Sequence, residues 1–151
     1  MTTKSGDINI ALVGNPNTGK TSLFNILTGL NQKVGNYPGI TVEKKIGSFT
    51  LPSGKKGIIT DLPGTYSINP SSIDENIVIE TLLQKEPSKR PDVLIVVADV
   101  INLKRNLLLL SQAMDLGYRA ILAINMSDQM EKRGIEIDIE RIEDAFGCSV
   151  V

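Results

Sequence analysis

The sequence predicts an α/β domain with a doubly wound, mostly parallel, six-stranded sheet that contains one antiparallel strand. Short apolar runs alternate with segments of helical spacing, which is typical of β-α-β units. Two of the runs, 45–51 and 56–60, are joined too closely for a crossover helix and therefore predict a hairpin. The 151 residues are 41% hydrophobic, which suits one domain with a buried core.

The individual elements follow from their local patterns. Apolar runs bounded by turn residues predict strands over 8–13, 45–51, 56–60, 93–99, 120–125 and 148–151. Helical spacing with good helix formers predicts helices over 20–29, 73–85, 102–116 and 138–146. Asp74 and Glu75 fall in the first turn of the second helix, where the helix dipole favours acidic side chains. The charged run 130–144 is typical of a solvated face.

Composition excludes several functional classes. The formal charge is −1 and aromatic residues make up 4% of the chain, so neither a basic surface nor a stacking platform for nucleic acid is expected. Cys148 is the one cysteine, and the polar start MTTKSGD lacks the features of a secretory signal. No apolar stretch approaches the length of a membrane span. We therefore expect a cytoplasmic domain without a nucleic-acid partner.

A glycine-rich motif lies between the first strand and the first helix. Gly14-x4-Gly19-Lys20-Thr21 matches a phosphate-binding loop, in which backbone N–H groups and the helix N-terminus surround an anion. Lys20 would reach the β and γ phosphates, and the Thr21 hydroxyl would bind Mg²⁺. The alternative is a glycine-rich turn that only caps a helix, but the strand before it and the helix after it favour phosphate binding.

Two downstream motifs indicate which nucleotide is bound. DLPG follows a strand, so Asp61 could hold Mg²⁺ through water and the Gly64 amide could face a γ phosphate. Asp-x-x-Gly alone is a common turn, but its position and distance after the phosphate loop favour a role in nucleotide binding. In NMSD, Asn125 and Asp128 are spaced to line a base pocket, and a carboxylate at Asp128 selects guanine over adenine.

The segment NYPGITVE, 36–43, is predicted to be a nucleotide-dependent switch loop. Pro38 stiffens it and Gly39 loosens it. The Thr41 hydroxyl would reach Mg²⁺ only when a γ phosphate draws the loop inward. A lone threonine is usually an ordinary polar loop residue, so this prediction depends on the accompanying motifs.

The segments GNPNTGKTSLFN, NYPGITVEKKIG, DLPGTYSI, RNLLLLSQAMDLG and NMSD together resemble the amino-terminal GTPase domain of the bacterial ferrous iron transport protein B family, FeoB. The resemblance covers nearly the whole chain. It implies a Ras-like phosphate-loop fold at the cytoplasmic face of the inner membrane. It also implies that residues 1–151 are a GTP-binding domain, truncated at its C-terminal end, of a protein whose helical spacer and Fe²⁺-moving membrane domain lie outside this chain.

The resemblance also implies a set of site residues. GTP or GDP would contact Gly14, Asn15, Asn17, Thr18, Gly19, Lys20, Thr21, Ser22, Asp61, Gly64, Asn125, Met126 and Asp128. Thr21, Thr41 and Asp61 would hold Mg²⁺, and Asn17 would hold K⁺ as in potassium-activated members of the family. Catalysis would use Lys20, Asn17, Thr41, Gly64 and Thr65.

Three departures from generic GTPases modify these expectations. Met126 replaces the usual lysine of Asn-Lys-x-Asp and offers apolar surface without charge. Thr65 stands where Ras-like enzymes have a water-orienting glutamine, and it is too short to copy that reach. The loop expected to close over guanine lies beyond Val151. We therefore expect modest nucleotide affinity, with water orientation left to backbone groups near Gly64 and Thr65.

Three rival functions share parts of this pattern. A ribosome- or tRNA-linked GTPase would usually carry a basic RNA-binding module, and none is visible. A phosphate-loop kinase would have no use for Asn-x-x-Asp after a strand. A non-hydrolysing nucleotide-binding module stays open as an alternative. Without histidine and with one cysteine, the domain is not expected to hold iron through soft ligands.

Overall fold

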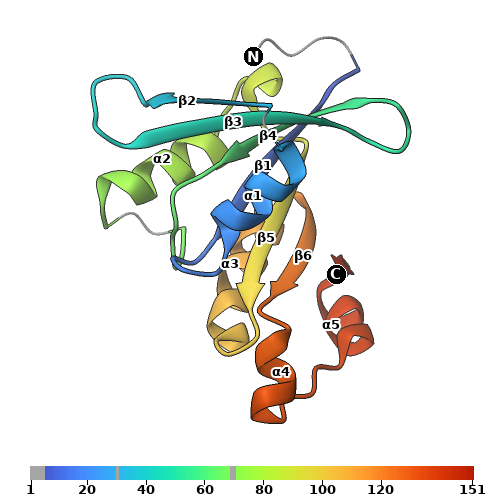
Figure 1. The fold of residues 1–151 in the computed structure, drawn as a ribbon. Coiled ribbons are helices and arrows are strands. Elements are labelled where there is room, and N and C mark those ends of the chain that lie inside the picture. Colours follow the sequence, from blue (N-terminus) through green and yellow to red (C-terminus); the bar gives the residue numbers. More distant parts are fainter. Residues whose placement is uncertain (1–5, 30, 69–70) are drawn as a thin grey trace.

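The computed structural model describes residues 6–29, 31–68 and 71–151 as a three-layer α/β domain with a seven-stranded sheet (Figure 1). The order across the sheet is β2-β3-β4-β1-β5-β6-β7. Only β3 runs against the other described strands, because it is antiparallel to both β2 and β4. The strands are β1 (Ile8–Gly14), β2 (Gln32–Asn36), β3 (Glu43–Thr50), β4 (Lys56–Asp61), β5 (Val93–Asp99), β6 (Arg119–Asn125) and β7 (Ser149–Val150).

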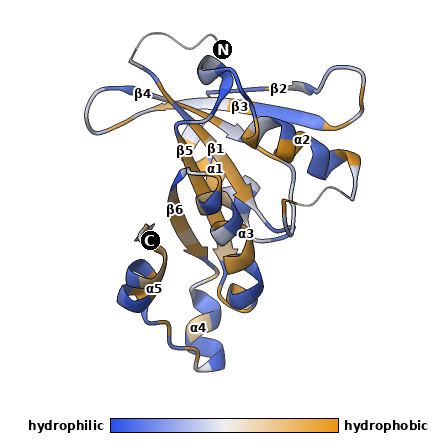
Figure 2. Cartoon of the chain, turned by 180° about the vertical axis from the view of Figure 1, so that it is seen from behind, coloured by the Kyte–Doolittle hydropathy of each residue, from blue (hydrophilic) through white to orange (hydrophobic). Residues whose placement is uncertain are grey.

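Helices cover both faces of this sheet. They are α1 (Lys20–Thr28), α2 (Ile73–Leu82), α3 (Leu103–Asp115), α4 (Asp128–Arg133) and α5 (Ile139–Phe146), with a 3₁₀ turn, η1, at Pro87–Lys89. Alternate residues of β1 enter different cores: Leu12 packs with Phe24 of α1, whereas Val13 packs with α2 and α3. Figure 2 shows hydrophobic residues concentrated on the central strands. The predicted doubly wound fold is confirmed.

The predicted count of six strands is wrong because β2 was not expected. None of its residues, QKVGN, is buried, so this edge strand lacks the apolar alternation that marks the others. It pairs with β3 from Gln32–Gly47 to Asn36–Glu43. The helix α4 was also not predicted, and it too has no buried residue. In the described residues, no helix combines the length and apolarity needed to cross a membrane.

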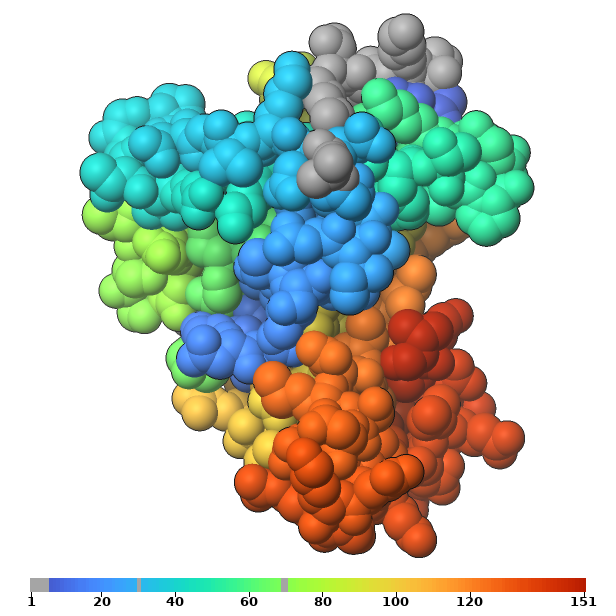
Figure 3. Space-filling model, viewed as in Figure 1, coloured from blue at the N-terminus to red at the C-terminus, as the bar shows by residue number. Residues whose placement is uncertain are grey.

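The parallel strands bring the sequence motifs to one edge of the sheet. β1, β4 and β6 end at Gly14, Asp61 and Asn125, and these carboxyl ends lie in the region where ligands of such sheets bind. In the space-filling view, α1 lies at the surface between the β2–β3 ribbon and α4 (Figure 3). The predicted phosphate loop and base motif therefore meet near the start of α1, and residues of the predicted switch loop line a cavity with Lys20 and Thr21 there.

Candidate nucleotide-binding site

The loop from β1 to α1, which carries the predicted phosphate-binding motif, has two residues in the left-handed region of backbone conformation. Asn17 and Gly19 both have positive φ, at 63° and 83°, which is strained for a residue with a side chain other than asparagine or aspartate. A Cβ at position 19 would collide with Asn125 Nδ2. Asn125 Nδ2 donates a hydrogen bond to the Thr18 carbonyl at 3.0 Å. Glycine at position 19 thus lets β6 approach the phosphate loop.

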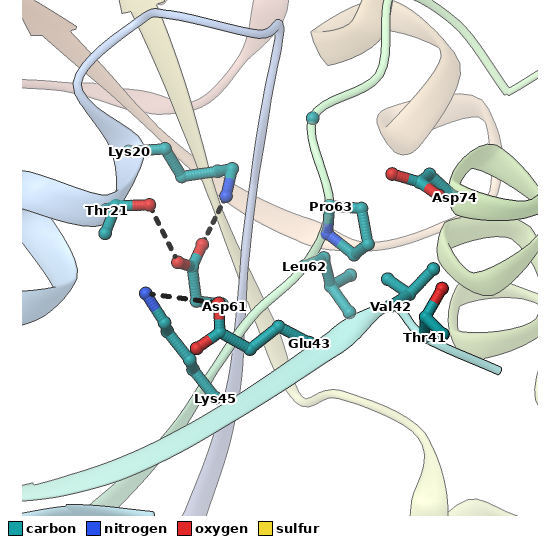
Figure 4. A pocket seen from close by; sticks show the side chains of 11 residues that line it. Lys20, Thr21, Thr41, Val42, Glu43, Lys45, Asp61, Leu62, Pro63 and Asp74 are labelled. Carbon is teal, nitrogen blue, oxygen red and sulfur yellow. Dashed lines mark hydrogen bonds and ion pairs between the residues drawn. The ribbon is translucent and has the colours of Figure 1, made fainter. Parts of the chain in front are cut away.

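Three predicted site residues meet at the end of β4 (Figure 4). Lys20 Nζ forms an ion pair with Asp61 Oδ1, and the Thr21 hydroxyl donates to Asp61 Oδ2 at 3.1 Å. The Lys20 and Asp61 side chains are 10% and 5% exposed. A pair this buried is weakly screened by salt, and removal of one partner leaves the other charge uncompensated.

Two adjoining cavities, of about 510 and 450 Å³, flank this ion pair. Lys20, Thr21, Gly64 and Asp74 line both. Thr41 and Asp61 line only the first, whose other lining residues are Val42, Glu43, Lys45, Leu62 and Pro63. The second is completed by Asn15, Pro16, Asn17, Gly19 and Ser22. The structure therefore brings most of the residues predicted to contact phosphate and metal around one polar space.

Lys45 is a member of this site that sequence reasoning missed. It lies opposite Asp61 in the β3–β4 pairing, and its Nζ is 3.9 Å from Glu43 Oε2. Figure 4 shows the Lys45 and Glu43 side chains meeting beside Asp61. The alternation of β3 could have placed Lys45 on one face, but only the register of the hairpin puts it next to Asp61.

The predicted switch loop, 36–43, is shorter than expected because its first residue, Asn36, ends β2 and its last, Glu43, begins β3. The remaining turn is closed by a hydrogen bond of 3.0 Å from the Tyr37 amide to the Val42 carbonyl, with Gly39 at φ 76°. Thr41 lines the first cavity. Burial, followed by the negative charge of Asp61, raises the pKa of Tyr37 to about 12. Its buried hydroxyl has no hydrogen-bond partner among the described residues.

Gly64 and Thr65 differ in what they present to the cavities. A Cβ at Gly64 would lie 3.0 Å from Pro16 Cα, so glycine allows the two loops to approach closely. Thr65 is buried: its amide donates to the Gly14 carbonyl at 3.0 Å and its hydroxyl to the Ser67 carbonyl at 2.7 Å. Because both Thr65 donors are engaged, the backbone N–H of Gly64 is the better candidate for contacting a phosphate or a water.

The residues predicted to recognise the base lie between the end of β6 and the start of α4. Met126 has φ 63°, an unusual conformation for its residue type. Asp128 is exposed, and a hydrogen bond of 3.0 Å from Gln129 Nε2, together with Lys132 at 3.5 Å, lowers the pKa of its carboxyl group. A hollow of about 260 Å³ adjoins Asn125 and is also lined by Ser22, Leu23, Ile26, Val97, Ala123, Ile124 and Val151.

Two asparagines of the phosphate loop differ in environment. Asn15 is 3% exposed, and neither polar atom of its side chain has a hydrogen-bond partner in the described part of the chain. Asn17 lines the second cavity. The Thr18 hydroxyl donates to the Asn15 carbonyl at 3.0 Å, which fixes the turn between them.

The donor set around Asp61 suits a hard cation. Hydroxyl and carboxylate oxygens of Thr21, Thr41 and Asp61 line one cavity, and Mg²⁺ prefers oxygen ligands. Within residues 6–29, 31–68 and 71–151, no group of three or more His, Cys, Asp or Glu residues could hold a metal ion. Oxygen ligands from nucleotide or water would therefore have to complete such a site.

The family model described as ferrous iron transport protein B, FeoB_N, matches residues 8–151. This chain belongs to the FeoB family. It is 46% identical over 143 residues to the Fe(2+) transporter FeoB of Leptospira biflexa, covering 95% of this chain and 20% of that protein. Its identity to the Legionella pneumophila FeoB is 50% over 145 residues, covering 93% of this chain and 18% of that protein. The chain thus spans about a fifth of the length of these FeoB relatives.

Solved FeoB structures share the fold described above. The cytosolic domain of T. maritima FeoB in a GDP form superposes with a TM-score of 0.88 at 44% identity, covering 96% of this chain and 55% of that one. Its GMPPNP form gives a TM-score of 0.87 at 44% identity, covering 95% and 55%. The isolated T. maritima FeoB G domain gives 0.85 at 43% identity, covering 96% and 86%. The Ras-like phosphate-loop fold is therefore confirmed.

Proposed function

We propose that this chain binds GTP and GDP with Mg²⁺ and hydrolyses GTP. The observation that carries the proposal is the meeting of Lys20, Thr21 and Asp61 beside a polar cavity that Gly64 also lines. The GDP and GMPPNP forms of the T. maritima FeoB cytosolic domain, which is 44% identical, support a guanine nucleotide as the ligand.

In the proposed nucleotide site, the charged residues bind different parts of the ligand. Binding would separate Lys20 from Asp61, so that the ammonium turns to the β and γ phosphates. Thr21, Thr41 and Asp61 would then hold Mg²⁺, which supplies positive charge to the phosphate oxygens. Because the Lys20 and Asp61 charges are buried, each exchanges one close counter-charge for another and neither is left unpaired.

The proposed base site uses Asn125, Met126 and Asp128. Asn125 would fix the base motif to the phosphate loop through Thr18. Asp128 would accept from the ring N–H and exocyclic amine of guanine, and the lowered pKa of its carboxyl group keeps it an acceptor at neutral pH. Met126 would supply apolar surface to the base.

Hydrolysis in this proposal needs groups other than a glutamine. The Gly64 amide would orient the γ phosphate and the attacking water, since the Thr65 amide is already bonded to Gly14. Asn17 would hold K⁺ beside the phosphates, adding positive charge where charge develops on the leaving oxygens. Asn17 lines the second cavity together with Lys20 and Gly64, which supports this role.

Within a whole FeoB protein, we propose that this domain regulates or drives ferrous iron uptake. Its partners would be its own helical spacer and membrane transport domain, and its place would be the cytoplasmic face of the bacterial inner membrane. The name Fe(2+) transporter, carried by relatives five times as long, supports this role.

A nucleotide-binding module that does not hydrolyse GTP is the second candidate, because both donors of Thr65 are engaged in backbone contacts. Single-turnover assays with GTP, Mg²⁺ and KCl separate the two functions. We expect phosphate release without any acceptor, abolished in Lys20→Ala. Tight GTP binding with no release of phosphate would contradict hydrolysis. Absence of any guanine-nucleotide binding would contradict the whole proposal.

A further inference from the structure

The segment that follows Gly64 is attached to α3 at two points. The Arg105 guanidinium lies over the Tyr66 ring, with Cζ 4.0 Å from the ring centroid. Further along the same helix, Gln112 Oε1 accepts a hydrogen bond of 2.8 Å from the Ile68 amide. Residues seven positions apart lie on one face of an α-helix, so both contacts come from the same side of α3.

The other end of this segment is attached to the phosphate loop. The Thr65 amide donates to the Gly14 carbonyl at 3.0 Å. Gly64 lines both of the cavities of about 510 and 450 Å³ that flank the Lys20–Asp61 ion pair, which we call the phosphate-side cavities. Only Thr65 separates Gly64 from Tyr66. A displacement of residues 66–68 along α3 would therefore act on the Gly64 amide through a short stretch of backbone.

Core packing does not account for the Arg105 contact. Arg105 is exposed and Tyr66 is 41% exposed, so the stacked pair lies at the surface. The helix itself is held by other residues: Asn106, Leu109 and Leu110 of α3 are buried. Loss of the Arg105 side chain should therefore loosen the segment at Tyr66 without unfolding α3, while Ile68 stays packed against the core.

We propose that Arg105 and Gln112 are positioning residues for GTP hydrolysis, which act by holding residues 66–68 so that the Gly64 amide stays at the phosphate cavities. The inference rests on the proposed GTPase function. It assigns a role to α3, a helix that lines neither phosphate-side cavity. Both residues act through Gly64, so they should affect the chemical step more than ground-state binding of GDP.

Steady-state and single-turnover hydrolysis by Arg105→Ala and Gln112→Ala test this role. We expect kcat to fall about threefold to tenfold in each, the size typical of losing one cation–π contact or one hydrogen bond. GDP affinity should change less than twofold. Arg105→Lys keeps a cation over the ring and should restore most of the rate. Lys104→Ala removes a neighbouring charge from the same helix and should leave kcat unchanged.

A second readout does not depend on hydrolysis. Amide hydrogen exchange of residues 65–68 should be faster in both alanine variants than in the unmodified protein, most of all at Ile68 when Gln112 is removed. The double variant Tyr66→Ala with Arg105→Ala should have the kcat of either single variant, since one contact is lost in each case.

The outcomes distinguish this inference from the function on which it rests. If the unmodified protein binds GTP without hydrolysing it, the proposed enzymatic function fails, while the exchange measurement still reports on the contact with α3. If the unmodified protein hydrolyses GTP and both alanine variants match it in kcat, the positioning role is overturned. Additive losses in the Tyr66 and Arg105 double variant would likewise overturn the pairing.

Discussion

Asn125 Nδ2 donates a hydrogen bond to the Thr18 carbonyl, although 107 positions separate the two residues in the chain. The contact joins the base motif at the end of β6 to the phosphate loop before α1. Gly19 permits it, because any Cβ there would meet the Asn125 amide. The two halves of the proposed nucleotide site therefore form one unit.

Asn125→Ala should weaken GTP and GDP binding alike by about tenfold, because the Thr18 carbonyl loses its partner and buried polar groups left unpaired cost about 1–3 kcal/mol. Calorimetric titration with each nucleotide measures the effect. Asn31→Ala, which removes the same kind of side chain from an exposed position outside both phosphate-side cavities, is the control. A loss confined to GTP would contradict a role in joining the two motifs.

Asp128→Asn should lower affinity for GTP and admit xanthosine triphosphate, whose ring presents an acceptor where guanine has a donor. Competition binding between the two nucleotides reports this change of preference. The exposed Glu131→Gln, on the same helix, tests whether any loss of negative charge has the same effect. If Asp128→Asn prefers GTP by the original margin, Asp128 does not read the base.

Thr41→Ala should leave GDP binding nearly intact, since GDP lacks the γ phosphate that would draw the loop inward. Hydrolysis should slow, and amides of residues 37–42 should exchange faster in the presence of a non-hydrolysable GTP analogue. Equal protection of that loop with GDP and with the analogue, in the unmodified protein, would show that it does not switch.

Hydrolysis in KCl should exceed hydrolysis in NaCl at equal ionic strength, because K⁺ near Asn17 would stabilise charge on the leaving oxygens. Asn17→Ala should remove this difference and largely keep Mg²⁺-dependent binding. Asn17 has a positive φ of 63°, so Asn17→Gly is the variant that keeps the turn if alanine strains it. If the unmodified protein hydrolyses GTP equally fast in KCl and in NaCl, Asn17 has a purely structural role.

Stability should fall as pH rises from about 10 to about 12, because the pKa of Tyr37 is raised from 10.0 to about 12 in the folded chain. The folded state then favours the neutral phenol. Its contribution to stability is complete below the pKa of the unfolded chain, 10.0, and is lost as the pH rises through the pKa of the folded chain, about 12. Tyr37→Phe should weaken that dependence and be neutral or stabilising at pH 7, since the phenol hydroxyl has no partner in the described residues. Thermal unfolding of both proteins across this range measures the difference. Identical slopes would contradict the prediction.

The helices and strands that the sequence predicts are those that bury apolar residues. β1 and β5 are apolar runs between the two cores, and α3 has apolar residues at helical spacing, so their patterns reveal them. β2 has no buried residue, and its existence depends on pairing with β3, which no local pattern reports. The helix α4 is six residues long and likewise buries nothing.

The candidate site divides in a similar way. Lys20, Thr21 and Asp61 belong to motifs of fixed spacing, and the parallel sheet brings their strand ends together without further information. Lys45 depends on the hairpin register, and the engaged donors of Thr65 depend on how its loop packs against Gly14. Neither register nor loop packing is encoded in residues adjacent in sequence, so these features required the three-dimensional arrangement.

The buried pair of Lys20 and Asp61 has a thermodynamic consequence for the proposed ligands. A nucleotide that takes Lys20 exposes the Asp61 carboxylate to Mg²⁺, and Mg²⁺ that takes Asp61 leaves the Lys20 ammonium to the phosphates. Each proposed ligand would thereby remove the competitor of the other, and we expect their binding to be positively cooperative. By linkage, Mg²⁺ must raise nucleotide affinity by the same factor by which nucleotide raises Mg²⁺ affinity. In the proposed site, Lys20 and Asp61 would thus exchange one counter-charge for another together, which would favour the complete metal–nucleotide complex over either component alone.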